Sequence, residues 1–325
     1  MKNIKIAFFF GGNGYSSNFN SLKTKLNHDG FSLDIRYIKT LYSLLKFSPE
    51  ILITHESCDL NNYLLLSPNN LKWLNIMSAG VDKTLAFLKL NNIPPEYLIT
   101  STKGIHKNAI SEYVIASILY FEKNINKINF NKKIKKWDRF PLTVVSGKRL
   151  LIYGVGQVGS ALALKFSSLG IKVSGVSLNT RYKKNFSKIF SLEESLEILP
   201  SFDYVINCMP LTEFTKNFFS LSTFKHFKKN SIFVNISRGE IVDEDSLVYA
   251  LDNDMIYAAV LDCFVIEPLP KKSKLWARDD VFLTPHISGF FVEGKEKGIN
   301  LFRKNLVKYI KGDKLLNLVC PDKGY

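Results

Sequence analysis

Short, mostly apolar runs alternate with polar or amphipathic stretches through the first third of the chain. The runs lie at 4–10, 50–54, 71–77 and 97–100, and the stretch NFNSLKTKLNHDG at 18–30 is amphipathic. Runs of this length that are separated by helical patterns are typical of buried strands with crossover helices. We therefore predict a parallel α/β sheet in this part of the chain.

A second set of apolar runs follows a long helical pattern at 108–125. The basic stretch from there to Gly147 is predicted to be irregular. Six further strands are predicted at 150–153, 172–176, 204–208, 231–235, 258–264 and 281–284. Helices fit between them at 192–199, 221–227 and 243–251, where Asp243 suits the N-cap position. Six strands with crossover helices are typical of a complete doubly wound domain.

Two domains are expected, because 325 residues exceed the usual size of one domain. We predict two doubly wound parallel-sheet α/β domains, one flavodoxin-like and one Rossmann-type. The first would comprise residues 1–107, with a last helix at 292–311 that returns residues 290–325 to it. The second would comprise residues 108–289.

Three glycines with the spacing G-x-G-x-x-G follow the predicted strand at 150–153. Gly154 permits a tight turn, Gly156 lets the backbone approach a pyrophosphate, and Gly159 lets the helix pack closely on the sheet. The helix N-terminus offers N–H groups and a partial positive charge to phosphates. Since a strand precedes the glycines and a helix and strand follow, the motif indicates a dinucleotide site rather than an ordinary loop. The residues expected there are Gly154, Gly156, Gln157, Val158 and Gly159.

The turn after the next strand bears on the choice of cofactor. Sites selective for NAD carry an acid about 20 residues after the glycines, which binds the ribose hydroxyls. The strand at 172–176 is followed instead by SLNTR, which contains no acid. The side chains expected to bind a 2′-phosphate are Ser177, Asn179, Thr180 and Arg181. We predict NADP(H) as the preferred cofactor and leave NAD(H), with a plain basic turn, as the alternative.

Three residues whose side chains could take part in catalysis follow three predicted strands of the second domain. Arg238 follows the strand at 231–235, Glu267 the next strand and His286 the last one. Because ligands of open α/β sheets bind outside the carboxyl ends of the strands, these residues suggest one site. Singly, each could be an ordinary surface or loop residue.

The motifs GVGQVG, NISRGEIVDEDSLVYAL, LDCFVIEPLP and LTPHISG resemble those of the D-isomer-specific 2-hydroxyacid dehydrogenases, and the order Arg, Glu, His matches their catalytic set. MSAGVDK at 77–83 resembles the family's substrate-carboxylate loop. STKGIHKNAISEYVIASIL at 101–119 resembles its linker and first long helix. The resemblance spans residues 70–312 and is weak before residue 70. LDCF replaces the commoner LDVF, so we expect Cys263 to be a buried apolar substitute.

The resemblance implies a role for each of these residues. Arg238 would hold the carboxylate and carbonyl oxygen of a 2-oxo acid, for which its planar fork is suited. His286 would be the general acid in reduction, and Glu267 would fix its tautomer and favour the imidazolium. The resemblance also implies substrate binding by the backbone of Ala79, Gly80 and Val81, and cofactor contacts by Pro210, Ser237 and Asp262. A purely structural place at the strand end is the alternative for Asp262.

The function implied is reduction of a small 2-oxo acid, with glyoxylate or hydroxypyruvate as the first candidates, to a D-2-hydroxy acid. The cofactor would lie between the domains, and the helix at 108–125 would pair across a two-fold axis in a homodimer. Phosphoglycerate dehydrogenase is an alternative, although no regulatory domain is expected after the last helix. A dinucleotide-sensing protein like the family's corepressors is another.

The net charge of the chain bears on its possible partners. The net charge of +15 raises nucleic acid as a partner and gives the corepressor alternative some weight. Apart from one cluster, however, the basic residues are scattered, so we expect a solvated face and no nucleic-acid partner. That cluster consists of Lys132, Lys133, Lys135, Lys136 and Arg139.

The cysteines and the apolar runs bear on compartment. The four cysteines contain no C-x-x-C pair, which favours reduced thiols in a cytoplasmic protein without a zinc site. No apolar run is long enough for a membrane span, so no membrane partner is expected.

Overall fold

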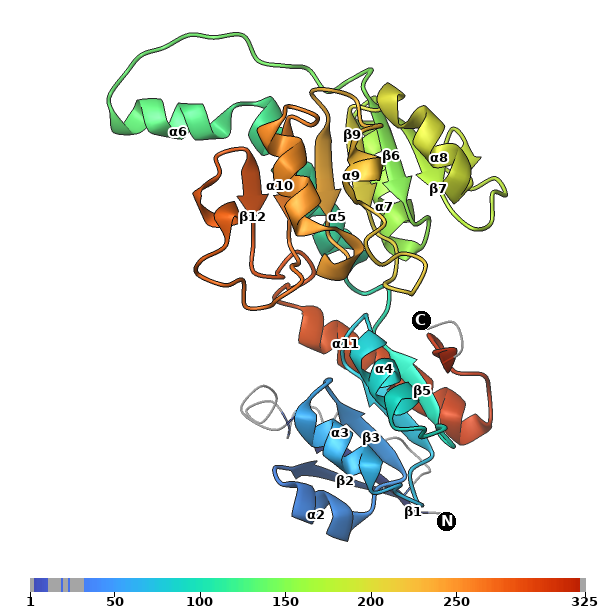
Figure 1. The fold of residues 1–325 in the computed structure, drawn as a ribbon. Helices are drawn as coiled ribbons and strands as arrows, with labels where there is room; N and C mark the ends of the chain where they lie inside the picture. The colour runs from blue at the N-terminus through green and yellow to red at the C-terminus, as the bar shows by residue number, and fades with distance from the viewer. Residues whose placement is uncertain (1–2, 11–18, 20–22, 24–31, 322–325) are drawn as a thin grey trace. The chain divides into compact units, whose positions relative to one another are not determined.

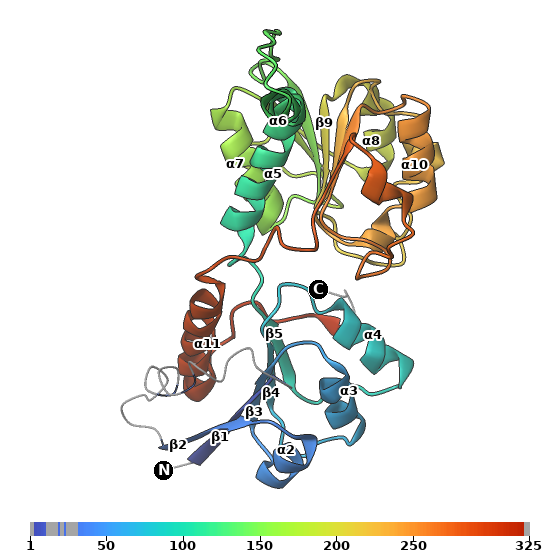
Figure 2. The same ribbon diagram turned by 90° about the vertical axis from the view of Figure 1, so that its left-hand side faces the viewer.

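The computed structural model describes residues 3–10, 19, 23 and 32–321. It divides the chain into two compact units. Unit 1 comprises Met1–Ile105 with Val292–Tyr325, and unit 2 comprises His106–Phe291. Each unit consists of a parallel sheet between two layers of helices (Figures 1 and 2), so the predicted α/β class with two parallel sheets is confirmed.

Unit 1 contains a five-stranded sheet in the order β2-β1-β3-β4-β5. Its strands are β1 (Asn3–Phe9), β2 (Ser32–Ile38), β3 (Ile51–Thr54), β4 (Trp73–Ile76) and β5 (Leu98–Ser101), and all of them pair in parallel. This is the flavodoxin-like order, as predicted. Figure 2 shows α2 (Leu41–Phe47), α3 (Cys58–Leu65) and α4 (Asp82–Leu90) on one face and α11 (Gly294–Lys311) on the other.

The four strands predicted in unit 1 are found, each within about two residues of its expected bounds. The edge strand β2 was not predicted, and helices α2, α3 and α4 were expected only as crossover helices without stated bounds. In β2 only Ile35 and Ile38 are buried, so its polar positions hide the strand pattern. The amphipathic stretch at 18–30 lies outside the described residues, except for Phe19 and Lys23.

Helix α11 is joined to the sheet of unit 1 by aromatic side chains. The Phe302 ring stacks on Trp73 with centroids 4.9 Å apart, and the Tyr309 hydroxyl donates a 2.9 Å hydrogen bond to Glu50. The helix ends at Gly312, whose φ of 75° is the left-handed conformation that glycine adopts without strain. The C-terminal helix therefore belongs to the same compact unit as the first five strands.

Unit 2 contains a seven-stranded parallel sheet in the order β12-β11-β10-β9-β6-β7-β8. Its strands are β6 (Arg149–Tyr153), β7 (Lys172–Val176), β8 (Ile189–Phe190), β9 (Tyr204–Asn207), β10 (Ile232–Asn235), β11 (Ala258–Leu261) and β12 (Val281–Leu283). The first strand of the unit, β6, lies beside β9, so strand order reverses between them. Such a switch point is where doubly wound folds bind ligands.

The helices of unit 2 cover both faces of this sheet (Figure 2). One face carries α5 (Lys107–Glu122) and α7 (Gln157–Ser168). The other carries α8 (Leu192–Ile198), α9 (Leu221–Phe224) and α10 (Glu244–Asp252). The Asp243 side chain accepts hydrogen bonds from two first-turn amides of α10, so the predicted N-cap is confirmed.

The expectation of an irregular basic stretch after α5 is wrong in part, because a second helix, α6 (Ile125–Lys133), begins there. Figure 1 shows α6 and the segment after it extending from the rest of unit 2. Its apolar side chains are exposed, including Ile128 and Phe130, so they do not produce the periodicity of a core-facing helix. The cluster of five basic residues near its end is exposed, as expected.

Among the described residues, no helix combines the length and apolar character that a membrane crossing requires.

Candidate active site

The glycine-rich turn joins β6 to α7 in the way that its spacing predicted. Gly154 has a φ of +95°, and a Cβ there would lie 2.8 Å from the Cys208 carbonyl oxygen at the end of β9. A Cβ on Gly159 would lie 2.1 Å from the Gly154 carbonyl oxygen. Both positions therefore require glycine, because the protein's own backbone leaves no room for a side chain there.

Gly156 differs from the other two glycines, because a Cβ there would meet no atom within 4 Å. It is the N-cap of α7, and Gln157 and Val158 form the first turn of that helix. This open space therefore adjoins the first turn of α7, whose amides have no partner within the helix. This arrangement fits a dinucleotide, whose pyrophosphate would be held by the turn and by the helix N-terminus.

In the turn after β7, side-chain oxygens accept hydrogen bonds from amides of the same turn. Ser177 Oγ accepts a hydrogen bond from the Asn179 amide, and Asn179 Oδ1 accepts one from the Arg181 amide. Asn179, Thr180 and Arg181 are exposed and Ser177 is half-buried. Lys183 Nζ donates to the Val155 carbonyl oxygen in the glycine-rich turn. The basic side chain of Lys183 therefore contacts the glycine-rich turn. The spacing of the glycines does not predict this contact.

Two buried asparagines at the ends of β9 and β10 shape the next part of the site. Asn207 Nδ2 donates to Asn235 Oδ1 at 3.0 Å, and Asn235 Nδ2 donates to the Arg238 carbonyl oxygen at 2.9 Å. Ser237 Oγ donates to the Met209 carbonyl oxygen, next to the exposed Pro210. Sequence reasoning missed both asparagines. Their position at the carboxyl ends of neighbouring strands is the feature by which the sequence could have revealed them.

Gly239 brings the turn that carries Arg238 against the loop that carries Glu267. A Cβ at Gly239 would lie 1.9 Å from the backbone carbon of Phe264, so only glycine allows the two loops to touch. Arg238 Nη1 donates to the Ser237 carbonyl oxygen at 2.8 Å, and Arg238 itself is half-buried. The sequence alone did not predict that position 239 requires glycine.

His286 and Glu267 form a hydrogen-bonded pair. The imidazole Nδ1 lies 3.0 Å from each carboxylate oxygen, and Glu267 Oε1 also accepts the Phe264 amide at 3.1 Å. An ionised carboxylate can only accept, so Nδ1 carries a proton and Nε2 is the nitrogen that can give or take one. The two side chains are 46% and 34% exposed, so a small substrate could reach the pair.

Asp262 is almost completely buried at the end of β11, with 1% of its surface exposed. Its carboxylate accepts hydrogen bonds from the Thr284 hydroxyl and from the amides of Ile287 and Ser288, at 2.6 to 2.9 Å. All three donors come from the loop that carries His286. Asp262 therefore anchors this loop, and the cofactor contact that the resemblance implies for it stays a prediction.

In unit 1, Ala79, Gly80 and Val81 lie between the end of β4 and the start of α4. Ala79 is exposed and Val81 is the N-cap of α4. Ser78 Oγ donates to the Gly80 carbonyl oxygen at 2.6 Å, and the Ser78 carbonyl accepts the Thr102 amide. Glu56 accepts the amide of Thr84 in the first turn of α4 at 2.7 Å. The loop is thus held by local hydrogen bonds at the carboxyl edge of its sheet.

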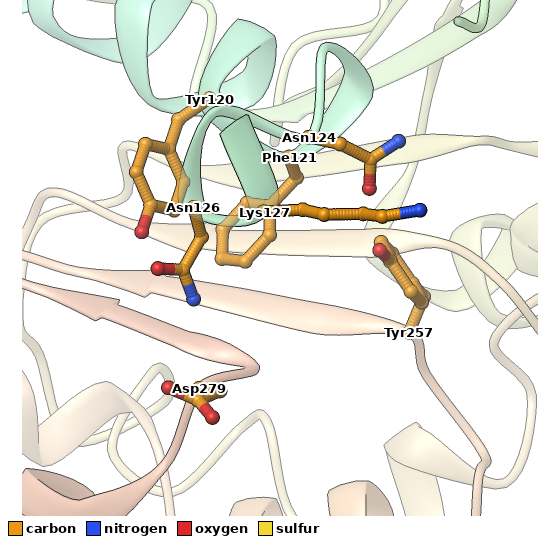
Figure 3. Close-up of a pocket in the computed structure, with 7 residues that line it drawn as sticks. All are labelled: Tyr120, Phe121, Asn124, Asn126, Lys127, Tyr257 and Asp279. Carbon is orange, nitrogen blue, oxygen red and sulfur yellow. The ribbon is translucent and has the colours of Figure 1, made fainter. Parts of the chain in front are cut away.

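Two further pockets lie among the residues that the structure describes. One, of about 400 Å³, includes Thr180 of the turn after β7, together with Tyr182, Lys188 and Glu194. The other, of about 160 Å³, is lined by residues of α5 and α6 and by Tyr257 and Asp279, as Figure 3 shows. The last two precede β11 and β12, so this pocket lies at the opposite edge of the sheet from the glycine-rich turn. Burial raises the pKa of the Cys208 and Cys263 thiols, which fits inert apolar side chains. Within the described part of the chain, no group of three His, Cys, Asp or Glu side chains could hold a metal ion.

The chain is similar to known proteins in sequence and in fold. A family model described as D-isomer specific 2-hydroxyacid dehydrogenase, NAD binding domain, matches residues 115–288. A glyoxylate reductase of Thermofilum pendens is 28% identical over 255 residues, which are 75% of this chain and 73% of that protein. A D-isomer specific 2-hydroxyacid dehydrogenase family protein from Aeromonas salmonicida has a TM-score of 0.86 at 27% identity, covering 98% of this chain and 99% of that one.

An NADPH-dependent glyoxylate/hydroxypyruvate reductase from Sinorhizobium meliloti, solved with NADP and sulfate, has a TM-score of 0.84 at 19% identity. The match covers 99% of this chain and 100% of that one.

A doubly wound sheet with a glycine-rich turn at its switch point is typical of a dinucleotide-binding domain. The matched model covers more than half of the chain, and the chain belongs to the D-isomer-specific 2-hydroxyacid dehydrogenase family. The protein is therefore an NAD(P)-dependent 2-hydroxyacid dehydrogenase or 2-oxoacid reductase, with a nicotinamide dinucleotide as its cofactor.

Proposed function

We propose that this protein uses NADPH to reduce a small 2-oxo acid, such as glyoxylate or hydroxypyruvate, to a D-2-hydroxy acid. The observation that carries the proposal is the His286–Glu267 pair, at 3.0 Å, on the same sheet edge as the glycine-rich turn. Arg238 follows the strand next to the one that carries Glu267. Similarity to proteins named glyoxylate reductase supports the choice of substrate.

In this proposal Arg238 binds the carboxylate and the carbonyl oxygen of the substrate through its planar guanidinium. NADPH, when bound, would supply the hydride for the carbonyl carbon. His286 Nε2 gives a proton to the carbonyl oxygen, so the carbon and oxygen receive two electrons and two hydrogens in all. Glu267 keeps the imidazole oriented by accepting from Nδ1. In the reverse direction His286 takes the hydroxyl proton.

The other site residues have supporting roles. The amides of Ala79, Gly80 and Val81 would bind the substrate carboxylate. Ser177, Asn179, Thr180 and Arg181 would bind the 2′-phosphate of NADPH, with Lys183 adding positive charge. The absence of an acid in this turn supports NADPH, because a carboxylate there would repel the phosphate.

We also propose that the protein is a homodimer and a cytoplasmic enzyme. The exposed apolar side chains of α6 and the segment after it support the dimer, because such patches mark interaction surfaces. They include Ile128, Phe130, Ile134 and Trp137, the last of which is 93% exposed.

The test is turnover by the purified protein with NADPH and with NADH on a panel of 2-oxo acids. Glyoxylate and hydroxypyruvate should be reduced at an enzyme-like rate, on the order of 1 s⁻¹ or faster. Preference for phosphohydroxypyruvate would support the phosphoglycerate dehydrogenase alternative. Dinucleotide binding without turnover of any 2-oxo acid would favour the corepressor-like alternative.

A further inference from the structure

Three hydrogen bonds tie the loop of His286 to the buried carboxylate of Asp262. Thr284 Oγ1 and the Ile287 amide donate to Oδ1, at 2.6 and 2.8 Å, and the Ser288 amide donates to Oδ2 at 2.9 Å. The donors therefore flank His286 on both sides in the chain. Hydrogen bonds to a charged acceptor with 1% exposure are strong, so they constrain the path of the loop.

The chain of hydrogen bonds continues from Thr284 to α5. The Tyr113 hydroxyl lies 2.6 Å from Thr284 Oγ1. Thr284 has one hydroxyl proton and gives it to Asp262, which as a carboxylate cannot donate. Tyr113 must therefore be the donor to Thr284. Burial raises the pKa of Tyr113 to about 12, so its hydroxyl keeps that proton throughout the range of ordinary assays.

The backbone of His286 needs such support. Its φ of 56° lies in the left-handed region, where a residue other than glycine is strained. Its amide donates to the Thr284 carbonyl oxygen at 3.0 Å, which closes a tight turn. Strained residues at functional sites persist only where surrounding contacts determine their conformation. Here those contacts are the pair with Glu267 and the anchoring of Thr284, Ile287 and Ser288.

We propose that Tyr113 and Thr284 are positioning residues, which hold His286 in its reactive place through the hydrogen-bond chain from Tyr113 to Thr284 to Asp262. The proposal rests on the proposed role of His286 as the proton donor. It assigns a role at the active site to a residue in the middle of α5. It also predicts that Tyr113 acts only through Thr284.

The experiment compares Thr284→Val, Thr284→Ser, Tyr113→Phe and the double variant Tyr113→Phe/Thr284→Val. Thr284→Val loses the donor to Asp262 and should lower kcat by about 10-fold or more, because small displacements of a catalytic group are costly. Thr284→Ser keeps the hydroxyl and should retain most of the turnover. Tyr113→Phe should lower kcat by about 3-fold to 10-fold. The double variant should be no worse than Thr284→Val alone, since both changes break one chain.

Tyr120→Phe is the matched control. Tyr120 lies two turns further along α5 and packs on the same ring, Phe282 of β12, as Tyr113 does. Tyr120 lines the pocket of Figure 3, together with Asp279. The Tyr120→Phe variant should keep the wild-type kcat. Cofactor dissociation constants and Tm should stay close to wild type in the single variants, which separates positioning from folding or binding.

A readout that does not depend on turnover completes the test. The imidazole nitrogens of His286 are followed by NMR in the protein bound to NADPH. Their signals should shift or broaden in Thr284→Val and Tyr113→Phe but not in Thr284→Ser or Tyr120→Phe. Unchanged signals and kcat in Thr284→Val would overturn the positioning role. A wild type that turns over no 2-oxo acid would refute the proposed function instead, and the NMR comparison would still decide the positioning role.

Discussion

His286 and Glu267 lie 19 positions apart in the chain, and each follows a different strand of the sheet. The ends of β11 and β12 are adjacent because these strands pair in parallel register. A carboxylate that accepts from Nδ1 leaves Nε2 as the nitrogen that can give or take a proton, so one hydrogen bond determines which atom would act in the proposed reaction.

Replacing His286 by alanine should lower kcat by about 100-fold or more, because a positioned proton donor contributes at least this much. Cofactor affinity should barely change, since the proposed cofactor residues lie elsewhere. Steady-state kinetics and dinucleotide titration measure the two quantities. The exposed His226 supplies the control, His226→Ala, which should behave as wild type. Near wild-type turnover by His286→Ala would contradict the assignment.

Arg238→Lys keeps the charge and loses the planar fork. We expect KM for the 2-oxo acid to rise by about 10-fold or more and kcat to fall, because the carbonyl group is no longer held in line. Arg139→Lys, at an exposed position, is the matched control. If the two variants show the same kinetics, Arg238 does not bind the substrate through two nitrogens.

Among the elements, the turn after β7 is the one that we propose selects between the two nicotinamide cofactors. Wild type should favour NADPH over NADH by about 10-fold or more in kcat/KM, or about 1.4 kcal/mol. Arg181→Ala should remove much of this preference and leave the kinetics with NADH nearly unchanged. Lys172→Ala, at the exposed opposite end of the same strand, should preserve the preference. A wild type that favours NADH would refute this interpretation of the turn.

Two positions of the glycine-rich turn can be compared directly, because an added side chain would clash with the backbone at Gly159 but not at Gly156. Gly159→Ala places a methyl group 2.1 Å from a backbone oxygen, so the turn must open. We expect it to destabilise the protein by about 1–3 kcal/mol, as overpacking does. Gly156→Ala meets no protein atom within 4 Å, so Tm should stay within about 2 °C while dinucleotide binding weakens.

Thermal unfolding and dinucleotide titration separate the two effects. Equal loss of Tm in both glycine variants would contradict the view that the space at Gly156 is reserved for the cofactor.

At the scale of the whole molecule, oligomeric state is the main proposal to test. Light scattering after size exclusion should give twice the mass of one chain. The double variant Phe130→Ser/Trp137→Ser should shift the protein toward the monomer, because it removes two large exposed apolar side chains of the α6 region. Leu90→Ser, at another exposed apolar position, is the control. A monomeric wild type would refute the dimer.

Much of this architecture was open to prediction from the sequence. Parallel strands are buried on both faces and therefore appear as continuous apolar runs, as in β6 and β9. Strand β2 escaped because it lies at the edge of its sheet, and α6 because its apolar residues are exposed. The three glycines were recognised because the turn imposes both their spacing and their neighbouring elements.

The sequence by itself determined the two α/β sheets, the glycine-rich turn and the order of Arg238, Glu267 and His286, because these follow from local periodicity and motif spacing. Only the tertiary structure decided that Gly239 must be glycine, that Asp262 holds the loop of His286, and that Tyr113 extends this network. These contacts join residues far apart in the chain, at strand ends whose adjacency depends on the order of strands in the sheet. The sequence pattern predicts the class of sheet but not which side chains and backbone groups touch, so these contacts become visible only in the folded protein.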